Sequence, residues 1–115
     1  MATFSKTAFS AATTGLGILV TGTVSASANT IHATSSSTTF DEIWLYATNN
    51  NASAVDLTIE FGETTATKVI KQSIPAVSGL TIVIPGLVLG PSKTITAFAG
   101  SANVVTVLGY VNRIS

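Results

Sequence analysis

Apolar and polar residues alternate most regularly over residues 55–61. The sequence of this segment is Val55-Asp56-Leu57-Thr58-Ile59-Glu60-Phe61. Because successive side chains of a β-strand point to opposite faces of its sheet, the alternation predicts a strand with one face in the core and the other toward solvent or a partner. We therefore expect Leu57 in the core, and Thr58 on the opposite face, where its truncation should hardly affect folding.

Similar runs, rich in Val, Ile, Thr and aromatic residues, recur along the rest of the chain. They lie at residues 16–24, 30–33, 40–48, 66–74, 80–84, 94–99 and 104–114. Turn signals separate them, among them Ile74-Pro75, Pro85-Gly86 and Gly90-Pro91. About eight short antiparallel strands without a helix of useful length predict an all-β, two-sheet sandwich. A jelly roll is the leading topology, and another Greek-key sandwich stays open.

The first residues lack both the helical and the strand period. Phe4 and Phe9 are the large apolar side chains of residues 2–14, which are otherwise rich in Ala, Ser and Thr. We interpret residues 1–14 as an extended N-terminal arm and residues 15–115 as a single β-sandwich domain. The arm is expected to attach to another chain through its two phenylalanines rather than to pack in its own sandwich.

Two of the predicted strands have apolar residues on both faces. In residues 40–48, Ile43, Leu45 and Ala47 share one face while Trp44 and Tyr46 occupy the other, and residues 104–114 leave neither face polar. Aromatic residues outside a core are favoured interface anchors. The candidate interface residues are therefore Phe4, Phe9, Trp44, Tyr46 and Tyr110. The alternative is a core filled from both sides.

The charge content supports contact with other proteins. Only 9% of the 115 residues are charged and the formal net charge is zero, whereas a typical globular domain has about 25% charged residues. We infer that much of the surface faces protein. The five basic residues are scattered among five acidic ones, so neither nucleic acid nor a membrane is an expected partner.

The pattern near the N-terminus is similar to that of a secretory signal peptide. Lys6, the apolar residues 16–20 and the tripeptide at 26–28 mimic its three parts. Glycines at positions 17 and 22 interrupt the apolar centre of this pattern. We therefore expect no secretion.

Residues able to carry chemistry are few. The chain has no cysteine, which excludes disulfides, zinc fingers and thiol catalysis. A catalytic triad would need His32, the one histidine, with a carboxylate such as Asp41, but no Gly-x-Ser-x-Gly motif is present. We interpret His32 as a polar strand-end residue, and Glu60 and Glu63 as solvated charges. We expect no enzyme, no metal and no cofactor.

Several strings from residue 30 onward resemble small structural proteins of tailed bacteriophages. The strings are Thr30-Ile31-His32-Ala33, Asp41-Glu42-Ile43-Trp44-Leu45-Tyr46-Ala47, Leu57-Thr58-Ile59-Glu60-Phe61-Gly62, Ile74-Pro75-Ala76, Pro85-Gly86-Leu87-Val88-Leu89 and Gly109-Tyr110-Val111-Asn112-Arg113-Ile114. The resemblance covers about three quarters of the chain, the part after the predicted arm. It carries over no catalytic residue.

The resemblance implies a β-sandwich that decorates or cements the capsid. Its partners would be the major capsid protein and other copies of the chain, as a homo-oligomer and specifically a trimer. The protein would be made in the host cytoplasm and would lie on the capsid surface of the virion. Two alternatives stay open. One is a tail or head-fibre adaptor of the virion, and the other is a carbohydrate-binding module in which Trp44 and Tyr46 stack on sugar rings.

Overall fold

The computed structural model describes residues 3–34, 37–77 and 79–114. Within these residues the chain forms nine strands and one short 3-10 turn, η1 (Ser25–Ser27). The strands are β1 (Phe4–Thr7), β2 (Ile18–Leu19), β3 (Asn29–Ala33), β4 (Phe40–Asn49), β5 (Val55–Phe61), β6 (Ile70–Ile74), β7 (Thr81–Leu89), β8 (Thr94–Ala99) and β9 (Val105–Ile114). No helix in the described part of the chain is long and apolar enough to cross a membrane.

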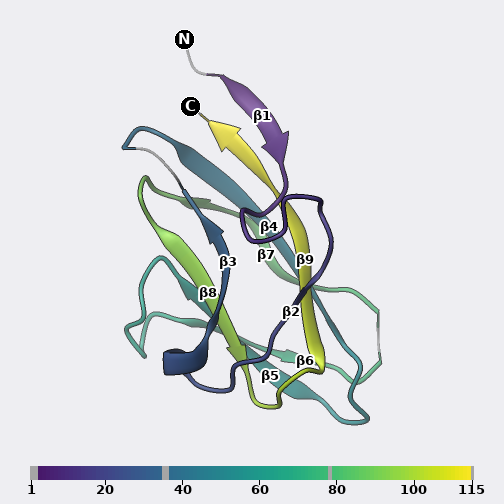
Figure 1. The fold of residues 1–115 in the computed structure, drawn as a ribbon. Helices are drawn as coiled ribbons and strands as arrows, with labels where there is room; N and C mark the ends of the chain where they lie inside the picture. Colours follow the sequence, from purple (N-terminus) through teal and green to yellow (C-terminus); the bar gives the residue numbers. More distant parts are fainter. Residues whose placement is uncertain (1–2, 35–36, 78, 115) are drawn as a thin grey trace.

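The strands form two antiparallel sheets that pack face to face (Figure 1). Sheet A has the order β1-β9-β4-β7, with β2 also paired to β9, and sheet B has the order β3-β8-β5-β6. The chain crosses between the sheets at nearly every connection from β2 to β9, which is the arrangement of a jelly roll. The prediction of an all-β, jelly-roll-like sandwich is confirmed.

Strand β9 is the central element of sheet A. It pairs with β4 along its whole length, from Phe40 opposite Ile114 to Asn49 opposite Val105. On its other side, β1 pairs with the C-terminal end of β9 and β2 pairs with its N-terminal half. One face of β9 buries Val105, Val107 and Val111 in the core, while the opposite face, with Leu108 and Tyr110, is partly exposed.

The predicted break at Pro85-Gly86 is wrong. Both residues lie inside β7, which pairs with β4 but has no strand on its other side within the described residues. Proline is tolerated on an edge strand, where its missing N–H is not needed for pairing. The pairing with β4 is irregular near this position, with register shifts between Ile43 and Trp44 and between Leu45 and Tyr46.

The core lies between the sheets and is aliphatic. Fully buried side chains from both sheets include Ile31, Ile43, Leu45, Leu57, Ile59, Ile74, Ile84 and Ile95. The prediction that Leu57 faces the core is correct. Thr58 and Glu60 do lie on the opposite face of β5, yet they are only 5% and 2% exposed. The expectations of a nearly neutral Thr58 truncation and of a solvated Glu60 are therefore corrected.

Truncation of Leu57 to alanine should destabilise the protein by about 2–5 kcal/mol, because it removes buried methyl groups and leaves a cavity between the sheets. Asp56, the preceding residue of β5, is exposed, and its replacement by alanine should change stability by less than about 0.5 kcal/mol. Urea denaturation of both variants measures the difference. Equal losses would contradict the assignment of the two faces.

The N-terminal segment departs from the expected arm. Of residues 1–14, the structure describes residues 3–14, and these pack on their own chain. Residues of β1 pair with β9 from Phe4 opposite Ile114 to Thr7 opposite Val111, and the amide of Ala11 donates to the carbonyl of Ile31 at 3.3 Å. Phe9 is 2% exposed and belongs to the core.

A missing side chain on β9 explains how Phe9 enters the core. A Cβ at Gly109 would lie 3.0 Å from the Cζ of Phe9 and 2.0 Å from the carbonyl oxygen of Trp44. Glycine at this position therefore lets the Phe9 ring come close to the backbone of β9. The expectation that Phe9 is free to contact another chain is wrong, because its ring is already covered.

Candidate functional site

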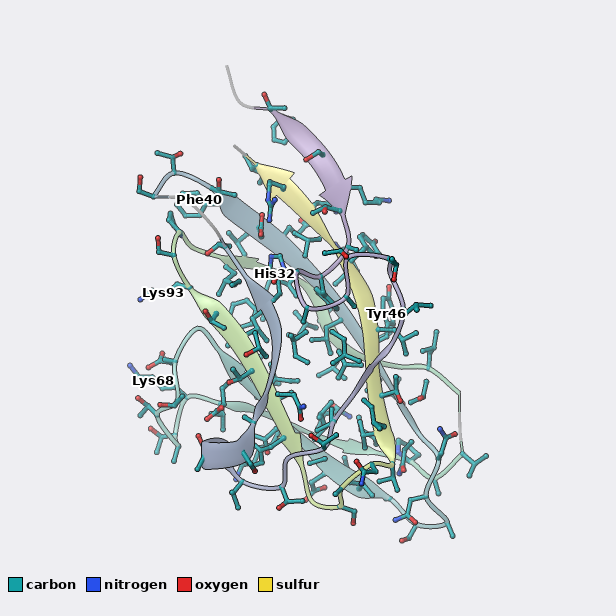
Figure 2. The ribbon with its side chains drawn as sticks, viewed as in Figure 1. His32, Phe40, Tyr46, Lys68 and Lys93 are labelled. Carbon is teal, nitrogen blue, oxygen red and sulfur yellow. The ribbon has the colours of Figure 1, made fainter. Side chains whose placement is uncertain are left out.

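The outer face of sheet A gathers apolar and aromatic side chains. Residues opposite each other in adjacent antiparallel strands share a face, so the pairings place four rows of side chains there. The rows are Phe4, Ile114 and Phe40; Lys6, Asn112, Glu42 and Val88; Tyr110 and Trp44; and Leu108, Tyr46 and Ile82. We call this surface the aromatic face. Phe40 lies at its end near the chain termini, and Tyr46 lies farther along the sheet (Figure 2).

Exposed apolar residues give the aromatic face its character. Phe4 is 74% exposed, Ile82 58%, Val88 54% and Phe40 45%. Trp44, Tyr46 and Tyr110 are half-buried. Exposed apolar side chains that gather on one face of a domain are typical of a contact site.

The two rings at the centre of the aromatic face are held in a row. Trp44 and Tyr110 stack with centroids 6.1 Å apart and an angle of 10° between their planes. The Nζ of Lys6 lies 4.7 Å from the centre of the Tyr110 ring. On the other side of Trp44, Gly86 provides room, since a Cβ there would lie 3.0 Å from the Cζ2 of the indole. The rings are therefore packed from both sides within their own chain.

Polar contacts fix the same row. The Oε1 of Glu42 accepts hydrogen bonds from the Nε1 of Trp44 at 2.7 Å and from the Nδ2 of Asn112 at 2.8 Å. These two bonds, Asn112 first, lower the pKa of Glu42 below its usual value. The indole orientation is thus set before any partner arrives, which reduces the entropy lost on binding.

The predicted interface residues fall into two groups. Trp44, Tyr46 and Tyr110 lie together on the aromatic face, and Phe4 lies at its end. Phe9 does not join them. Sequence reasoning missed Phe40, Leu108 and Ile82 as neighbours of this set. The alternation in residues 40–48 and 104–114 carried that signal for the first two, because residues two apart in a strand share a face.

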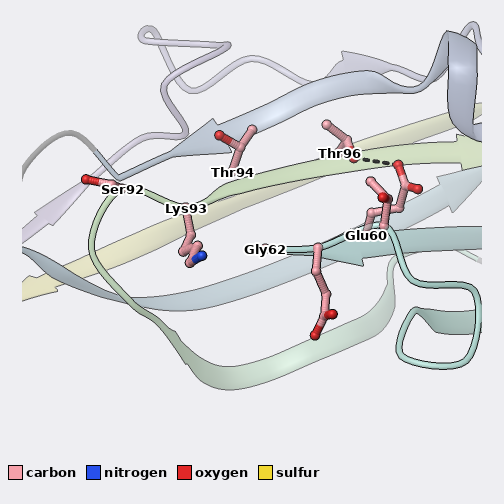
Figure 3. A pocket seen from close by; sticks show the side chains of 8 residues that line it. Glu60, Gly62, Ser92, Lys93, Thr94 and Thr96 are labelled. Atoms are coloured by element: carbon pink, nitrogen blue, oxygen red, sulfur yellow. Dashed lines mark hydrogen bonds between the residues drawn. The ribbon is translucent and has the colours of Figure 1, made fainter.

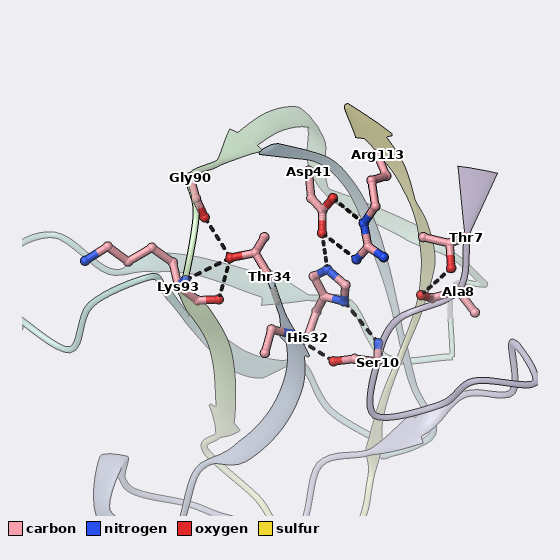
Figure 4. A network of polar contacts seen from close by, with 10 residues as sticks. Thr7, Ala8, Ser10, His32, Thr34, Asp41, Gly90, Lys93 and Arg113 are labelled. Atoms are coloured by element: carbon pink, nitrogen blue, oxygen red, sulfur yellow. Dashed lines mark hydrogen bonds and ion pairs between the residues drawn. The ribbon is translucent and has the colours of Figure 1, made fainter. Parts of the chain in front are cut away.

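A second cluster surrounds the single histidine (Figure 4). The Nε2 of His32 lies 2.6 Å from the Oδ2 of Asp41. Asp41 also accepts from Arg113, through Nε to Oδ1 and Nη2 to Oδ2, both at 3.0 Å. The side chains of His32 and Asp41 are 1% and 0% exposed. The interpretation of His32 as a merely polar strand-end residue is therefore incomplete, because the cluster joins β3 of sheet B to β4 and β9 of sheet A.

The histidine cluster is not arranged as a catalytic triad. The Nδ1 of His32 accepts the backbone N–H of Ser10 at 3.0 Å, while the hydroxyl oxygen of Ser10 accepts the amide of Ala33 at 2.9 Å. Both ring nitrogens are thus engaged. A general base must reach the nucleophile's proton with a free lone pair, and here the nearby serine meets the ring through its amide.

The ion pair of Asp41 and Arg113 stays charged within the cluster. Burial alone would raise the pKa of Asp41, but hydrogen bonds from Arg113 and His32 together outweigh it, so the pKa lies below the usual value. The hydrogen bond to Asp41 raises the pKa of Arg113. A buried carboxylate with two donors is stable only while both partners stay in place.

Two adjoining pockets open where β5 ends and β8 begins, and Figure 3 shows the first of them. They measure about 300 and 370 Å³ and share Gly62, Glu63 and Lys93. The buried carboxylate of Glu60 borders the first pocket. Its oxygens accept hydrogen bonds from the hydroxyls of Ser25 at 2.6 Å and Thr96 at 2.7 Å. Within the described residues no three His, Cys, Asp or Glu side chains group as metal ligands. Glu60 is thus engaged within the fold, whereas Glu63 and Lys93, which line both pockets, are exposed charged side chains.

Comparisons with protein-family models, with curated proteins and with solved structures find no match to this chain.

Proposed function

We propose that this protein is a non-enzymatic virion structural protein, a capsid decoration protein that binds the assembled lattice of the major capsid protein. The aromatic face is the observation that carries the proposal. It presents exposed apolar residues such as Ile82 and Phe4 beside a fixed Trp44 and Tyr110 pair. Trp and Tyr held in this way are the residues that contribute most at protein interfaces. The resemblance to phage structural proteins supplies the identity of the partner.

The low charge of the chain supports the same proposal. With 9% charged residues and no net charge, the protein lacks the repulsion that keeps small domains apart. We propose that part of its apolar surface joins copies of the chain, as a homotrimer, and that the rest contacts the capsid. Trimers match the local three-fold positions of a lattice.

Stabilisation of the head would follow from mass action. A subunit that binds only the assembled shell lowers the free energy of that state in proportion to the logarithm of its free concentration over its dissociation constant. An oligomer that spans neighbouring capsid subunits gains further from multivalency. This mechanism needs a rigid body and a contact surface, and it needs no active site.

The engaged state of the titratable side chains supports a non-enzymatic role. Both ring nitrogens of His32 form hydrogen bonds within the fold. Both carboxylate oxygens of Glu60 accept hydrogen bonds from hydroxyl groups. Catalytic groups require access to a substrate. In the described part of the chain these two residues instead hold loops and sheets together.

A charge placed on the aromatic face should abolish binding to capsids without unfolding the protein. Ile82→Lys is the test, because this side chain is 58% exposed and lysine there puts an unpaired charge into an apolar contact. Val24→Lys is the matched control, since Val24 is 56% exposed and precedes η1, which packs on β8 of sheet B. In cosedimentation with capsids that lack the protein, the affinity of Ile82→Lys should be at least about tenfold lower, as loss of one hot-spot contact implies. The affinity of Val24→Lys should be unchanged.

Equal binding by both lysine variants would contradict the assignment of the aromatic face. Copy number and position in purified virions separate decoration from the alternative role. Many copies spread over the head indicate a decoration protein, whereas a few copies at one vertex indicate a tail or head-fibre adaptor. Cryo-electron microscopy of the virion gives both.

The carbohydrate-binding alternative has less support. Sugar rings stack on an open aromatic face, and the faces of Trp44 are packed between Tyr110 and Gly86. Tyr46 is the remaining candidate for such stacking. A glycan array probed with the purified protein tests this alternative directly.

A further inference from the structure

The contact between Ser10 and His32 requires an unprotonated ring nitrogen. The backbone N–H of Ser10 donates to Nδ1 at 3.0 Å, so Nδ1 must present a lone pair. The proton of the neutral ring is then on Nε2, which donates to Asp41 at 2.6 Å. If Nδ1 also took a proton, two N–H donors would face each other and this hydrogen bond would be lost.

A second proton on the ring would leave the buried group around it with a net positive charge. Asp41 from β4 is the nearest carboxylate, and it is already paired through two hydrogen bonds with Arg113 from β9. From the loop before β8, Lys93 reaches this region only through its backbone, which bonds Thr34, and its side chain extends away (Figure 4). The buried group of His32, Asp41 and Arg113 is neutral with an uncharged ring and would carry one positive charge after protonation.

The elements held by this contact are those of the N-terminal segment. Ser10 follows Phe9, whose ring centroid lies 5.9 Å from that of His32. The same segment contributes β1, which pairs only with the last residues of β9, and the Ser10 hydroxyl accepts the amide of Ala33. β1 is mostly exposed, whereas the Phe9 ring is buried in the core and Ser10 bonds both His32 and Ala33.

We propose that His32 is an acid-sensitive latch, by which we mean that its Nδ1 holds the N-terminal segment through Ser10 only while the ring is neutral. With a neutral ring, Ser10 is bonded to Nδ1 and Phe9 is seated over Gly109. Protonation of Nδ1 removes the acceptor and adds a buried charge, so the backbone around Ser10 is released from the ring more often while the two sheets stay folded. Because the closed state needs the lone pair of Nδ1 as the acceptor for Ser10, it requires the neutral ring and should be lost as pH falls.

Amide hydrogen exchange of the full-length chain, followed by NMR between about pH 8 and pH 5, tests the latch over the range in which histidine changes charge. Nitrogen chemical shifts of the His32 ring report its protonation in the same samples. The protection factor of the Ser10 amide should fall by about tenfold or more as the ring takes up a proton. The amide of Leu45, in the centre of sheet A, should keep its protection.

A non-titrating variant gives the second arm of the test. In His32→Asn the side-chain oxygen replaces Nδ1 as the acceptor for Ser10, and no proton can be added in this pH range. Protection of Ser10 should then be independent of pH. The latch is overturned if Ser10 stays protected to pH 5 in the unmodified protein, if Leu45 loses protection in parallel, or if the asparagine variant shows the same acid response. Should that variant not fold, the unmodified protein decides alone.

Discussion

Replacement of Phe9 by alanine should destabilise the protein by about 3–5 kcal/mol, the cost of emptying a buried phenylalanine site. The ring is 2% exposed and fills the space over Gly109 on β9. A Cβ at Gly109 would lie 3.0 Å from the Cζ of Phe9, so the ring packs directly on the backbone of β9. Thermal or urea unfolding followed by circular dichroism measures the loss.

Phe4→Ala is the control for this prediction. Phe4 belongs to the same segment but is 74% exposed, so its truncation should change stability by less than about 0.5 kcal/mol. An arm that only attaches to other chains would give no loss for either variant. A stable Phe9 variant would thus restore the interpretation of residues 1–14 as an arm outside the sandwich.

Replacement of Asp41 by asparagine should cost about 3–5 kcal/mol, because it removes one partner of a buried ion pair. Asp41 is fully buried and joins His32 of one sheet to Arg113 of the other. The neutral amide leaves the Arg113 guanidinium without its counter-charge and weakens the bond to His32. Asp56→Asn is the matched control, since Asp56 is exposed and the change there should be small.

The pH dependence of stability should change with Asp41. Its pKa is lowered in the folded protein from the ordinary 3.8, so its contribution is fully present above the unfolded pKa and is lost as pH falls through the folded pKa. Between neutral pH and about pH 5 this carboxylate adds no slope. Urea unfolding at a series of pH values below about 5 should show a shallower decline for Asp41→Asn than for the unmodified protein. Parallel curves would mean that other carboxylates dominate.

The strands and their faces could be read from the sequence because the period of two is local. Residues 55–61 alternate without interruption, and the structure places Leu57 in the core. The same period put Trp44 and Tyr46 on the face opposite Ile43 and Leu45, as observed. Because neighbouring residues of one strand decide which face each side chain takes, the sequence was sufficient to predict the fold class and most residues of the aromatic face.

The burial of Glu60 and the conformation of Pro85-Gly86 depended on residues of other strands and loops. Glu60 reads as a strand-end charge, yet its oxygens meet Ser25 from η1 and Thr96 from β8. Pro85-Gly86 reads as a turn, yet an edge position lets both residues continue β7. In each case the deciding neighbour lies on another strand or loop, and no periodicity of the local sequence encodes it.

The sequence by itself determined an all-β sandwich, a low-charge surface and an outward aromatic pair, because composition and a two-residue period act over short stretches of chain. Only the tertiary structure decided that Phe9 enters the core and that His32, Asp41 and Arg113 meet. These contacts join the first residues, the third strand and the last strand of the chain. Their energy comes from burial and pairing between segments far apart in sequence, so it exists only once the two sheets have packed.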